Sequence, residues 1–315
     1  MKKCLIALLV VSGCLTPLCE AGVVTYTLNG QVFRLQTQTG AVPFNVTKKL
    51  NQITPGRGDG RLNISPNGQW LVMDAQRFDA ECTGWPCLVV MSRAMTDVQV
   101  VRAAGQLIHP EGFSAIASAG DMIIYPAAGS SHALDLWKVT RDTAGNWGTP
   151  TVLTESSPYA WNSQPAISSD GSRLVFDCGT VPYGGPGTAI CEVEMSGKRF
   201  RIVITPEQTP AGYPAGTALH HPDYADGSIV FEADWGGERI WRLPAGSTVP
   251  HPVRPNQSND NSPCVLLSGD IVSLWLNHPA NPSGLHELKL LGPRGYRMLV
   301  TGKDINDIGI GCGGL

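Results

Sequence analysis

The residues of this chain best suited to chemistry are polar side chains that stand at or just before short apolar stretches. Carboxylates, imidazoles and amides can hold water, coordinate a divalent cation or move a proton. If folding gathered them, the carboxylates would repel one another unless a cation or a proton lay between them. They could instead cap backbone groups where strands begin, so a ligand-binding or cation-binding ring and a set of structural caps are the two interpretations. The residues are Asp59, Glu111, Asn162, His220, His221, Asp260, Asp304 and Asp307.

The adjacent pair His220 and His221 is the most specific of these candidates. Neighbours on a strand point to opposite sides, so one imidazole would face a central channel. Beside a carboxylate it could bind a metal or act as a general base. The sequence has no HExxH or CxxC motif to strengthen a metal site, so a structural role for the pair is the alternative.

A second group of candidates consists of aromatic and charged residues in longer connecting stretches. Exposed aromatic rings suit stacking on sugar rings or anchoring a peptide. The alternative is that about half of them cover the top of the core. The group comprises Arg77, Phe78, Asp79, Trp85, Tyr183, Trp235 and His278.

A repeated hairpin would position both groups. Residues 164–177 predict a strand, a Ser-Ser-Asp-Gly turn whose glycine supplies a positive φ, and a second apolar strand. Similar turns end at glycines 68, 120, 227 and 269, so successive turns are 52, 51, 56 and 42 residues apart. Periods of this size are typical of propeller blades of about 40–50 residues.

The two ends of the chain together supply the strands of one further blade. Strands expected at residues 23–28, 31–36 and 43–47 have no inner partner, and one strand at residues 304–315 has no followers. We therefore predict an all-β fold, a six-bladed β-propeller of four-stranded antiparallel blades, closed by N- and C-terminal strands that share one blade. In such a ring, both candidate groups would lie on one face around the central channel.

The composition agrees with this fold and limits the classes of partner that the protein could bind. Charged residues are 16% of the chain, while Gly (36) and Pro (24) are abundant, which suits short strands and tight turns. A net charge of −3 gives no electrostatic footprint for nucleic acid or for an anionic membrane surface.

The N-terminus predicts export. Two lysines precede an apolar run at residues 5–11 that is too short to span a bilayer. We expect a signal peptide at residues 1–21, followed by a single domain at 22–315 in the periplasm or outside the cell. The alternative is a lipoprotein signal at residues 1–13, with Cys14 as a lipid anchor in the outer membrane.

Cysteine arithmetic favours the first cleavage, because it leaves six cysteines, an even number suited to an oxidising compartment. Six cysteines permit fifteen pairings. Local pairing of Cys82 with Cys87 and of Cys178 with Cys191 is geometrically reasonable, which leaves Cys264 and Cys312. Blade register places these two on the inner strands of the fifth and closing blades, where a bond would tie the closing strand into the ring.

The turns Ser65-Pro66-Asn67-Gly68 and Ser168-Ser169-Asp170-Gly171, together with strands such as Ile240-Trp241-Arg242-Leu243, resemble the WD40-like repeats of TolB-like six-bladed propellers. The resemblance covers nearly the whole mature chain and implies the propeller domain alone. It implies little about activity, since such propellers occur in Tol-system periplasmic proteins, in prolyl oligopeptidase-like enzymes and in lyases of sugar-acid oligomers.

We therefore expect a non-catalytic binding or scaffold module that recognises an envelope or extracellular protein or glycan on its channel face. The alternative is a metal-assisted polysaccharide lyase or hydrolase that uses the same face, with His220 or His221 and nearby carboxylates. No cofactor is firmly implied beyond a divalent cation in the central channel.

Overall fold

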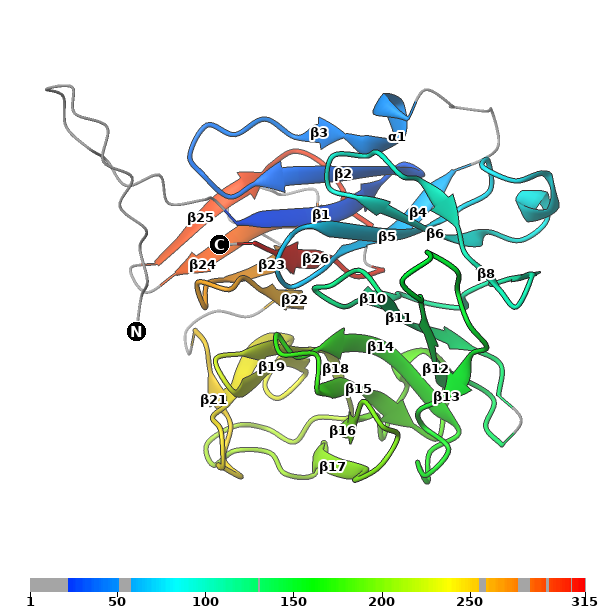
Figure 1. Cartoon of the computed structure of the whole chain (residues 1–315). Coiled ribbons are helices and arrows are strands. Elements are labelled where there is room, and N and C mark those ends of the chain that lie inside the picture. The colour runs from blue at the N-terminus through cyan, green and yellow to red at the C-terminus, as the bar shows by residue number, and fades with distance from the viewer. Residues whose placement is uncertain are drawn as a thin grey trace, which may run out of the picture.

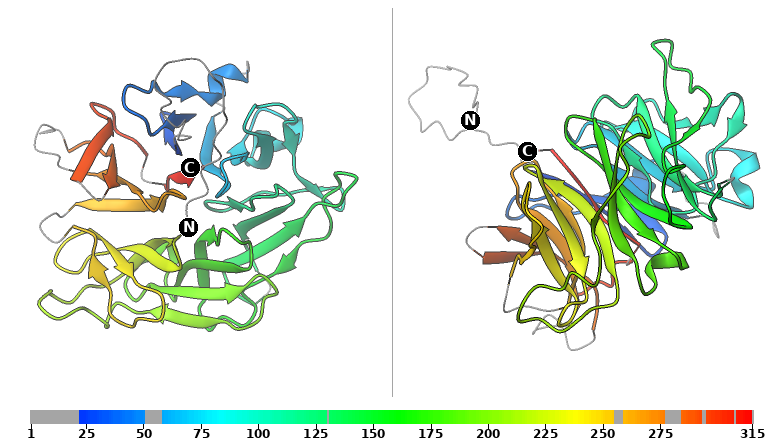
Figure 2. Two further views of the ribbon diagram at one scale, coloured as in Figure 1. Left: turned by 60° about the vertical axis from the view of Figure 1, so that its left-hand side comes forward. Right: turned by 90° about the horizontal axis from the view of Figure 1, so that it is seen from below.

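The computed structural model describes residues 22–50, 58–129, 131–254, 259–276, 284–292, 295–306 and 308–314. Six four-stranded antiparallel sheets surround a common centre, where the C-terminal strand β26 (Gly311–Gly313) lies beside the inner strands of the neighbouring sheets (Figures 1 and 2). The predicted six-bladed propeller is confirmed. The expected export signal, with Cys14, lies outside the described residues.

We number the blades along the chain and give their strands from the centre outward. Blades 1 to 3 are β4 (Asp59–Ile64), β5 (Trp70–Ala75), β6 (Cys87–Ser92) and β7 (Gln99–Val100); β10 (Ala115–Ile116), β11 (Met122–Ala127), β12 (Asp135–Thr140) and β13 (Thr151–Val152); and β14 (Trp161–Ile167), β15 (Arg173–Gly179), β16 (Ala189–Glu194) and β17 (Arg201–Ile204).

Blades 4 to 6 follow the same order. They are β18 (Leu219–Ala225), β19 (Ser228–Ala233), β20 (Arg239–Leu243) and β21 (His251–Pro252); β22 (Asp260–Val265), β23 (Ile271–Trp275), β24 (Glu287–Gly292) and β25 (Gly295–Val300); and β26, β1 (Val23–Leu28), β2 (Gln31–Gln36) and β3 (Phe44–Asn45).

Blade 6 closes the ring as predicted from the two ends of the chain. Strand β26 pairs antiparallel with β1, with Cys312 opposite Val24. One expected strand is shorter than predicted: β3 covers two residues and is followed by the helical turn α1 (Val46–Lys49). The Asn45 side chain accepts a hydrogen bond from the Lys48 N–H, and this N-cap ends the strand and begins the turn.

The glycines of the inner hairpin turns all have positive φ, but they differ in how much space a side chain would have. Gly68 has φ +73°, and a Cβ there would lie 2.9 Å from the backbone nitrogen of Gly314. Gly171 has φ +72°, but a Cβ there would meet nothing within 4 Å. The turn of blade 1 therefore also makes room for the C-terminal end of the chain.

Four inner strands carry a kink that the repeat pattern did not reveal. Arg61, Gln164, His221 and Ser262 have φ between +46° and +50°, and pairing with the second strand shifts register at each of these positions. Such a bulge bends the strand and re-aims the side chains beside it. The kinked residues of three blades precede a proline.

Apolar side chains from neighbouring blades fill the spaces between the sheets. Fully buried examples are Trp235 and Trp241 in blade 4 and Phe176 in blade 3. Outside the blades, the described chain adds a small hairpin, β8 (Arg102–Ala103) with β9 (Gln106–Leu107), and two 3-10 turns, η1 (Ala80–Thr83) and η2 (Pro182–Gly184). Among the helices of the described residues, none is long and apolar enough to cross a bilayer.

Candidate functional site

The antiparallel order of the strands assigns the loops to two faces. Loops that enter the inner strands, and loops that join second to third strands, emerge on the same face; we call it the channel face. The inner hairpin turns lie on the opposite face. The channel face therefore carries both groups of candidates taken from the sequence.

Asp59, at the start of β4, is held by a buried ion pair. Its Oδ1 accepts from Nε of Arg77 at 2.7 Å, and its Oδ2 accepts from Nη2 of Arg77 at 2.5 Å and from the Thr47 hydroxyl at 2.7 Å. Both side chains of the pair are at most 1% exposed. Asp59 thus joins blade 1 to Thr47 of blade 6, and neither Asp59 nor Arg77 is open to a ligand.

Asn162, Glu111 and Asp304 satisfy backbone groups. The fully buried amide of Asn162 donates to the carbonyls of Leu134 and Tyr159 and accepts from the Ser157 hydroxyl. Glu111 is exposed and accepts from the Ala128 N–H at 3.0 Å. Asp304 accepts from the N–H of His286, and this hydrogen bond holds the pKa of Asp304 below its usual value. The capping interpretation describes these three positions.

Asp260, at the start of β22, forms an ion pair with Lys289 of β24. Both side chains are buried, and the ammonium lies 4.0 Å from the centre of the Trp275 ring. Burial raises the pKa of Asp260, and the charge of Lys289 opposes that rise. The pair is neutral as a unit, so it contributes no free charge to the channel face.

The two histidines meet two buried acids where blades 3, 4 and 5 adjoin. Nδ1 of His220 lies 3.7 Å from Oδ2 of Asp177 in β15, and Nδ1 of His221 lies 3.2 Å from Oε2 of Glu232 in β19. The same Glu232 oxygen accepts the N–H of Ser262 from blade 5 at 2.9 Å. Three blades are therefore tied together through this cluster.

The pKa values of three members of this cluster are set by burial and by contacts within it. Burial raises the pKa of Asp177, with the hydrogen bond from His220 opposing the rise. Burial disfavours the charged form of His220, but its contact with Asp177 outweighs this and raises the pKa of His220. Burial also works against ionisation of Glu232, yet the hydrogen bond from His221 lowers its pKa. Burial and the contacts inside the cluster therefore act in opposite directions on each of these three groups.

A small cavity of about 60 Å³ lies along the central channel and is lined by the inner strands of all six blades. His221, Gln164 and Asn63 contribute polar groups to its wall, and proline, alanine and isoleucine side chains supply most of the rest. The Gln164 side chain makes no hydrogen bond to the described residues, so its amide is open to a small polar ligand.

The expected cation was tied to carboxylates that converge on the central channel. Each described carboxylate among them has a protein partner in its own corner of the ring. Within the described ranges, no group of three or more His, Cys, Asp or Glu residues could hold a metal ion.

The aromatic candidates divide between core and surface. Trp235 is fully buried and donates its indole N–H to the Pro206 carbonyl, so it cannot stack on a ligand. Phe78 is partly buried, beneath the Arg77 guanidinium. Trp85 is 56% exposed. The Tyr183 side chain, His278 and Asp307 lie outside the described residues.

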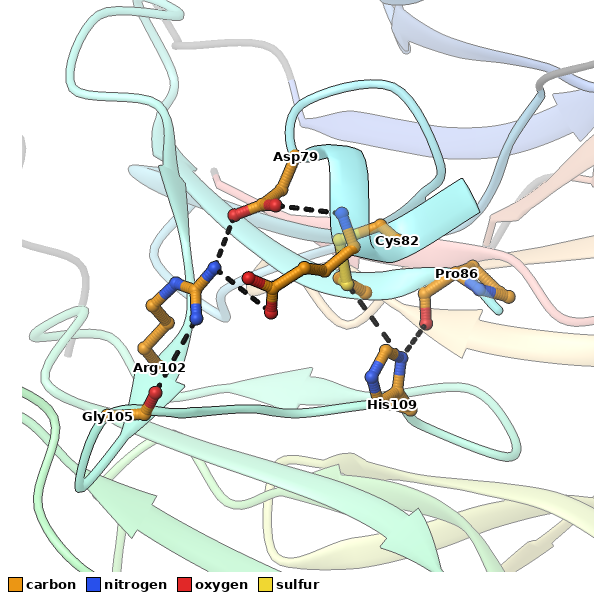
Figure 3. The surroundings of a disulfide bond; sticks show 8 residues. Asp79, Cys82, Pro86, Arg102, Gly105 and His109 are labelled. Carbon is orange, nitrogen blue, oxygen red and sulfur yellow. Dashed lines mark hydrogen bonds and ion pairs between the residues drawn. A yellow bond between two sulfur atoms is a disulfide. The ribbon is translucent and has the colours of Figure 1, made fainter. Parts of the chain in front are cut away.

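Trp85 sits in a loop closed by a disulfide. Cys82 and Cys87 are bonded, and Nδ1 of His109 lies 3.2 Å from the Pro86 carbonyl oxygen (Figure 3). Arg102 donates to Asp79 at 2.6 Å on the other side of the loop (Figure 3). The other two disulfides, Cys178–Cys191 and Cys264–Cys312, have the predicted pairing.

Several residues with clear roles were not among the sequence candidates. Asp177 and Glu232 occupy equivalent places near the ends of apolar second strands, as does Asp74, which pairs with Arg61 at 2.6 Å in blade 1. A signal was present in the sequence: an acid interrupts the apolar runs Leu71–Ala75, Leu174–Cys178 and Ile229–Ala233 at the same position. The buried Lys289 had no comparable signal.

No family model matches the sequence, and no curated protein matches it. Solved structures with similar folds include TolB from Acinetobacter baumannii, with a TM-score of 0.67, 10% identity and coverage of 95% of this chain and 68% of that one.

A second similar structure is a putative TolB from Agrobacterium tumefaciens, with a TM-score of 0.56, 16% identity and coverage of 90% and 91% of the two chains. A third is hydrazine synthase from Kuenenia stuttgartiensis, with a TM-score of 0.61, 10% identity and coverage of 92% of this chain and 46% of that one. At these identities the similarity concerns the fold, and in its fold the chain is a TolB-like six-bladed β-propeller.

Proposed function

We propose that the chain is an exported, non-catalytic binding module that recognises an envelope or extracellular protein or glycan on its channel face. One observation carries the proposal: the described polar residues at the starts of the inner strands are engaged by other protein groups. What the channel face offers a partner is shape, the central cavity and exposed side chains such as Trp85.

The disulfides support export. Three bonds use all six cysteines of the described chain. Such bonds persist in oxidising compartments and are rare in the cytosol. Cleavage of the leader can be checked by N-terminal sequencing of the protein recovered from the periplasm and from the medium. A first residue at Gly22 would support an ordinary signal peptide, and a lipid-modified Cys14 would support the anchor.

Photo-cross-linking in the producing cell tests the binding role. A benzophenone amino acid would replace Glu111 or Val181 on the channel face, and Asp121 on the opposite face as the control. All three residues are exposed. We expect one discrete cross-linked partner from the two channel-face positions and none from Asp121. No product from either channel-face position, or equal products from both faces, contradicts the proposal.

The histidine cluster favours a second candidate, a metal-assisted lyase or hydrolase acting on a polysaccharide. Its support is the contact of His220 with Asp177, which raises the pKa of His220, next to His221 in the wall of the central cavity. The test is incubation of the purified protein, with and without added Zn²⁺, Mn²⁺ or Ca²⁺, with acidic and neutral oligosaccharides. Chain cleavage that is lost in His220→Gln would replace the binding proposal by the catalytic one.

A further inference from the structure

Trp85 differs from the other seven tryptophans of the chain. It is 56% exposed, whereas the others are buried or half-buried. Trp70 and Trp147 lie beneath Arg141, and Trp235, Trp241 and Trp275 pack against other aromatic rings. Among the described residues, the Trp85 ring has no aromatic or cationic neighbour and its indole N–H has no acceptor. Its recognition capacity is therefore unused within the chain.

The loop that carries Trp85 is held by a disulfide, by a side-chain cap and by two contacts from a neighbouring segment. The Cys82–Cys87 disulfide closes a ring of six residues around Thr83, Gly84, Trp85 and Pro86. The side chain of Asp79 caps η1 by accepting the Glu81 N–H at 3.0 Å.

The neighbouring 102–109 segment supplies the other two supports. Arg102 donates to Asp79, and the ring of His109 contacts the Pro86 carbonyl and lies 3.8 Å from Sγ of Cys87 (Figure 3). An aromatic side chain on a preorganised loop loses little conformational freedom on binding, which is what makes such residues effective anchors.

The charges around the loop indicate the chemistry of the occupant. The Arg102 guanidinium is committed to Asp79 at 2.6 Å, and its distance to Oε2 of Glu81 is 3.6 Å. Glu81 keeps 68% of its side chain exposed. Two carboxylates thus face one guanidinium, and the excess negative charge lies on the residue that precedes the disulfide ring.

We propose that Trp85 and Glu81 form a recognition site for an arginine or lysine side chain of a partner protein. The cation would lie over the indole face, the strongest aromatic platform for a cation, and its charge would be balanced by Glu81. This inference rests on the proposed binding role and gives that role an anchor and a partner chemistry. The Cys82–Cys87 bond acts as a positioning element, because it fixes the loop without contacting the ligand.

The test uses the folded protein with ¹⁵N-labelled tryptophan, whose indole N–H signals report each ring separately; Trp85→Phe assigns the signal. The probes are the capped peptides Gly-Gly-Arg-Gly-Gly and Gly-Gly-Gln-Gly-Gly, and chitotetraose. We expect the arginine peptide to shift the Trp85 signal saturably and the other two to leave it in place. Glu81→Gln should weaken binding of the arginine peptide several-fold, whereas the matched channel-face variant Val181→Ala should leave that binding unchanged.

Other outcomes overturn the site. If only chitotetraose shifts the Trp85 signal, the ring binds sugars and not cations. If both peptides shift it equally, the positive charge plays no part in binding. No shift by any probe removes the site altogether.

The photo-cross-linking experiment separates this inference from the binding role. If Trp85→Ala leaves the cross-links from Glu111 and Val181 unchanged, the channel face binds its partner without this anchor, and only the inference fails. If the unmodified protein gives no cross-links there, the binding role itself fails.

Discussion

Cys264 on the inner strand of blade 5 is disulfide-bonded to Cys312 in β26, the strand that completes blade 6. The C-terminal end of the chain is therefore joined covalently to a neighbouring blade as well as by hydrogen bonds to β1. The bond spans 48 residues of sequence and lies between two blades, whereas the other two disulfides lie within one blade or its loop.

Removal of this bond should cost more stability than removal of either local bond. The entropy of closing a loop grows with its length, so Cys264→Ser/Cys312→Ser should lower the free energy of unfolding by about 4 kcal/mol. Cys178→Ser/Cys191→Ser should cost about 3 kcal/mol and Cys82→Ser/Cys87→Ser about 2 kcal/mol. Urea unfolding of the three double variants measures the order. An equal loss in all three would show that ring closure does not depend on the Cys264–Cys312 bond.

Arg77→Met should destabilise the fold strongly, because it leaves the buried Asp59 carboxylate without its cation. A loss of about 3–5 kcal/mol is expected for breaking a buried pair from one side. Asp59→Asn combined with Arg77→Met should recover a large part of this loss, since the uncompensated charge is then removed. Chemical denaturation of the two single variants and the double variant forms the cycle, and strictly additive losses would contradict a buried ion pair.

Gly68→Ala and Gly171→Ala form a matched pair. Both positions have positive φ, so both alanines should cost about 1 kcal/mol in backbone strain. Only Gly68→Ala must also displace the backbone of Gly314, which a Cβ would approach to 2.9 Å. We expect Gly68→Ala to lower the melting temperature clearly more than Gly171→Ala. Equal decreases in melting temperature would mean that the C-terminal end of the chain can move away from the new Cβ without loss of stability.

Stability should fall with rising pH through Asp223. Burial raises the pKa of Asp223 to about 7, although the N–H groups of Val265 and Tyr224 oppose the rise. The folded chain therefore holds a proton that the unfolded chain releases near pH 4, and the stabilisation present below that pH is lost as the pH rises to about 7.

The free energy of unfolding of the unmodified protein, minus that of Asp223→Asn, should accordingly shrink between pH 5 and pH 7.5. Asp170→Asn is the control: hydrogen bonds from Ser168 and Ser172 lower the pKa of Asp170 to about 2, so its contribution is constant in this range and is lost only at lower pH. Urea unfolding at several pH values gives both differences. A constant or growing difference for Asp223→Asn would show that the carboxyl is ionised throughout.

Local sequence signals were sufficient for the architecture. A turn such as Ser168–Gly171 needs only its own residues to form, because the serine and aspartate side chains satisfy nearby groups and glycine supplies the positive φ. Repetition of that turn, with three unpartnered strands at one end of the chain and one at the other, predicted the blade number, the shared closing blade and the cysteine pairs.

The site depended on contacts that no local pattern records. Asp59 and Asp260 could be chosen as polar residues at strand starts, but their cations come from elsewhere: Arg77 from the loop after β5 and Lys289 from β24. The left-handed kink at His221 also changes which way the two histidines point, because it breaks the alternation on which the sequence argument relied.

The sequence by itself thus determined where strands begin and turn and how many blades they build, since these depend on residues close together in the chain. Only the tertiary structure decided which polar side chains have partners within the protein and which remain available to a ligand. Burying a charge is tolerated only where a partner from another strand or loop lies at hydrogen-bonding distance, and its position depends on how the strands and loops pack. Asp59 has such a partner in Arg77, whereas the ring of Trp85 is exposed and has no aromatic or cationic neighbour within the described chain.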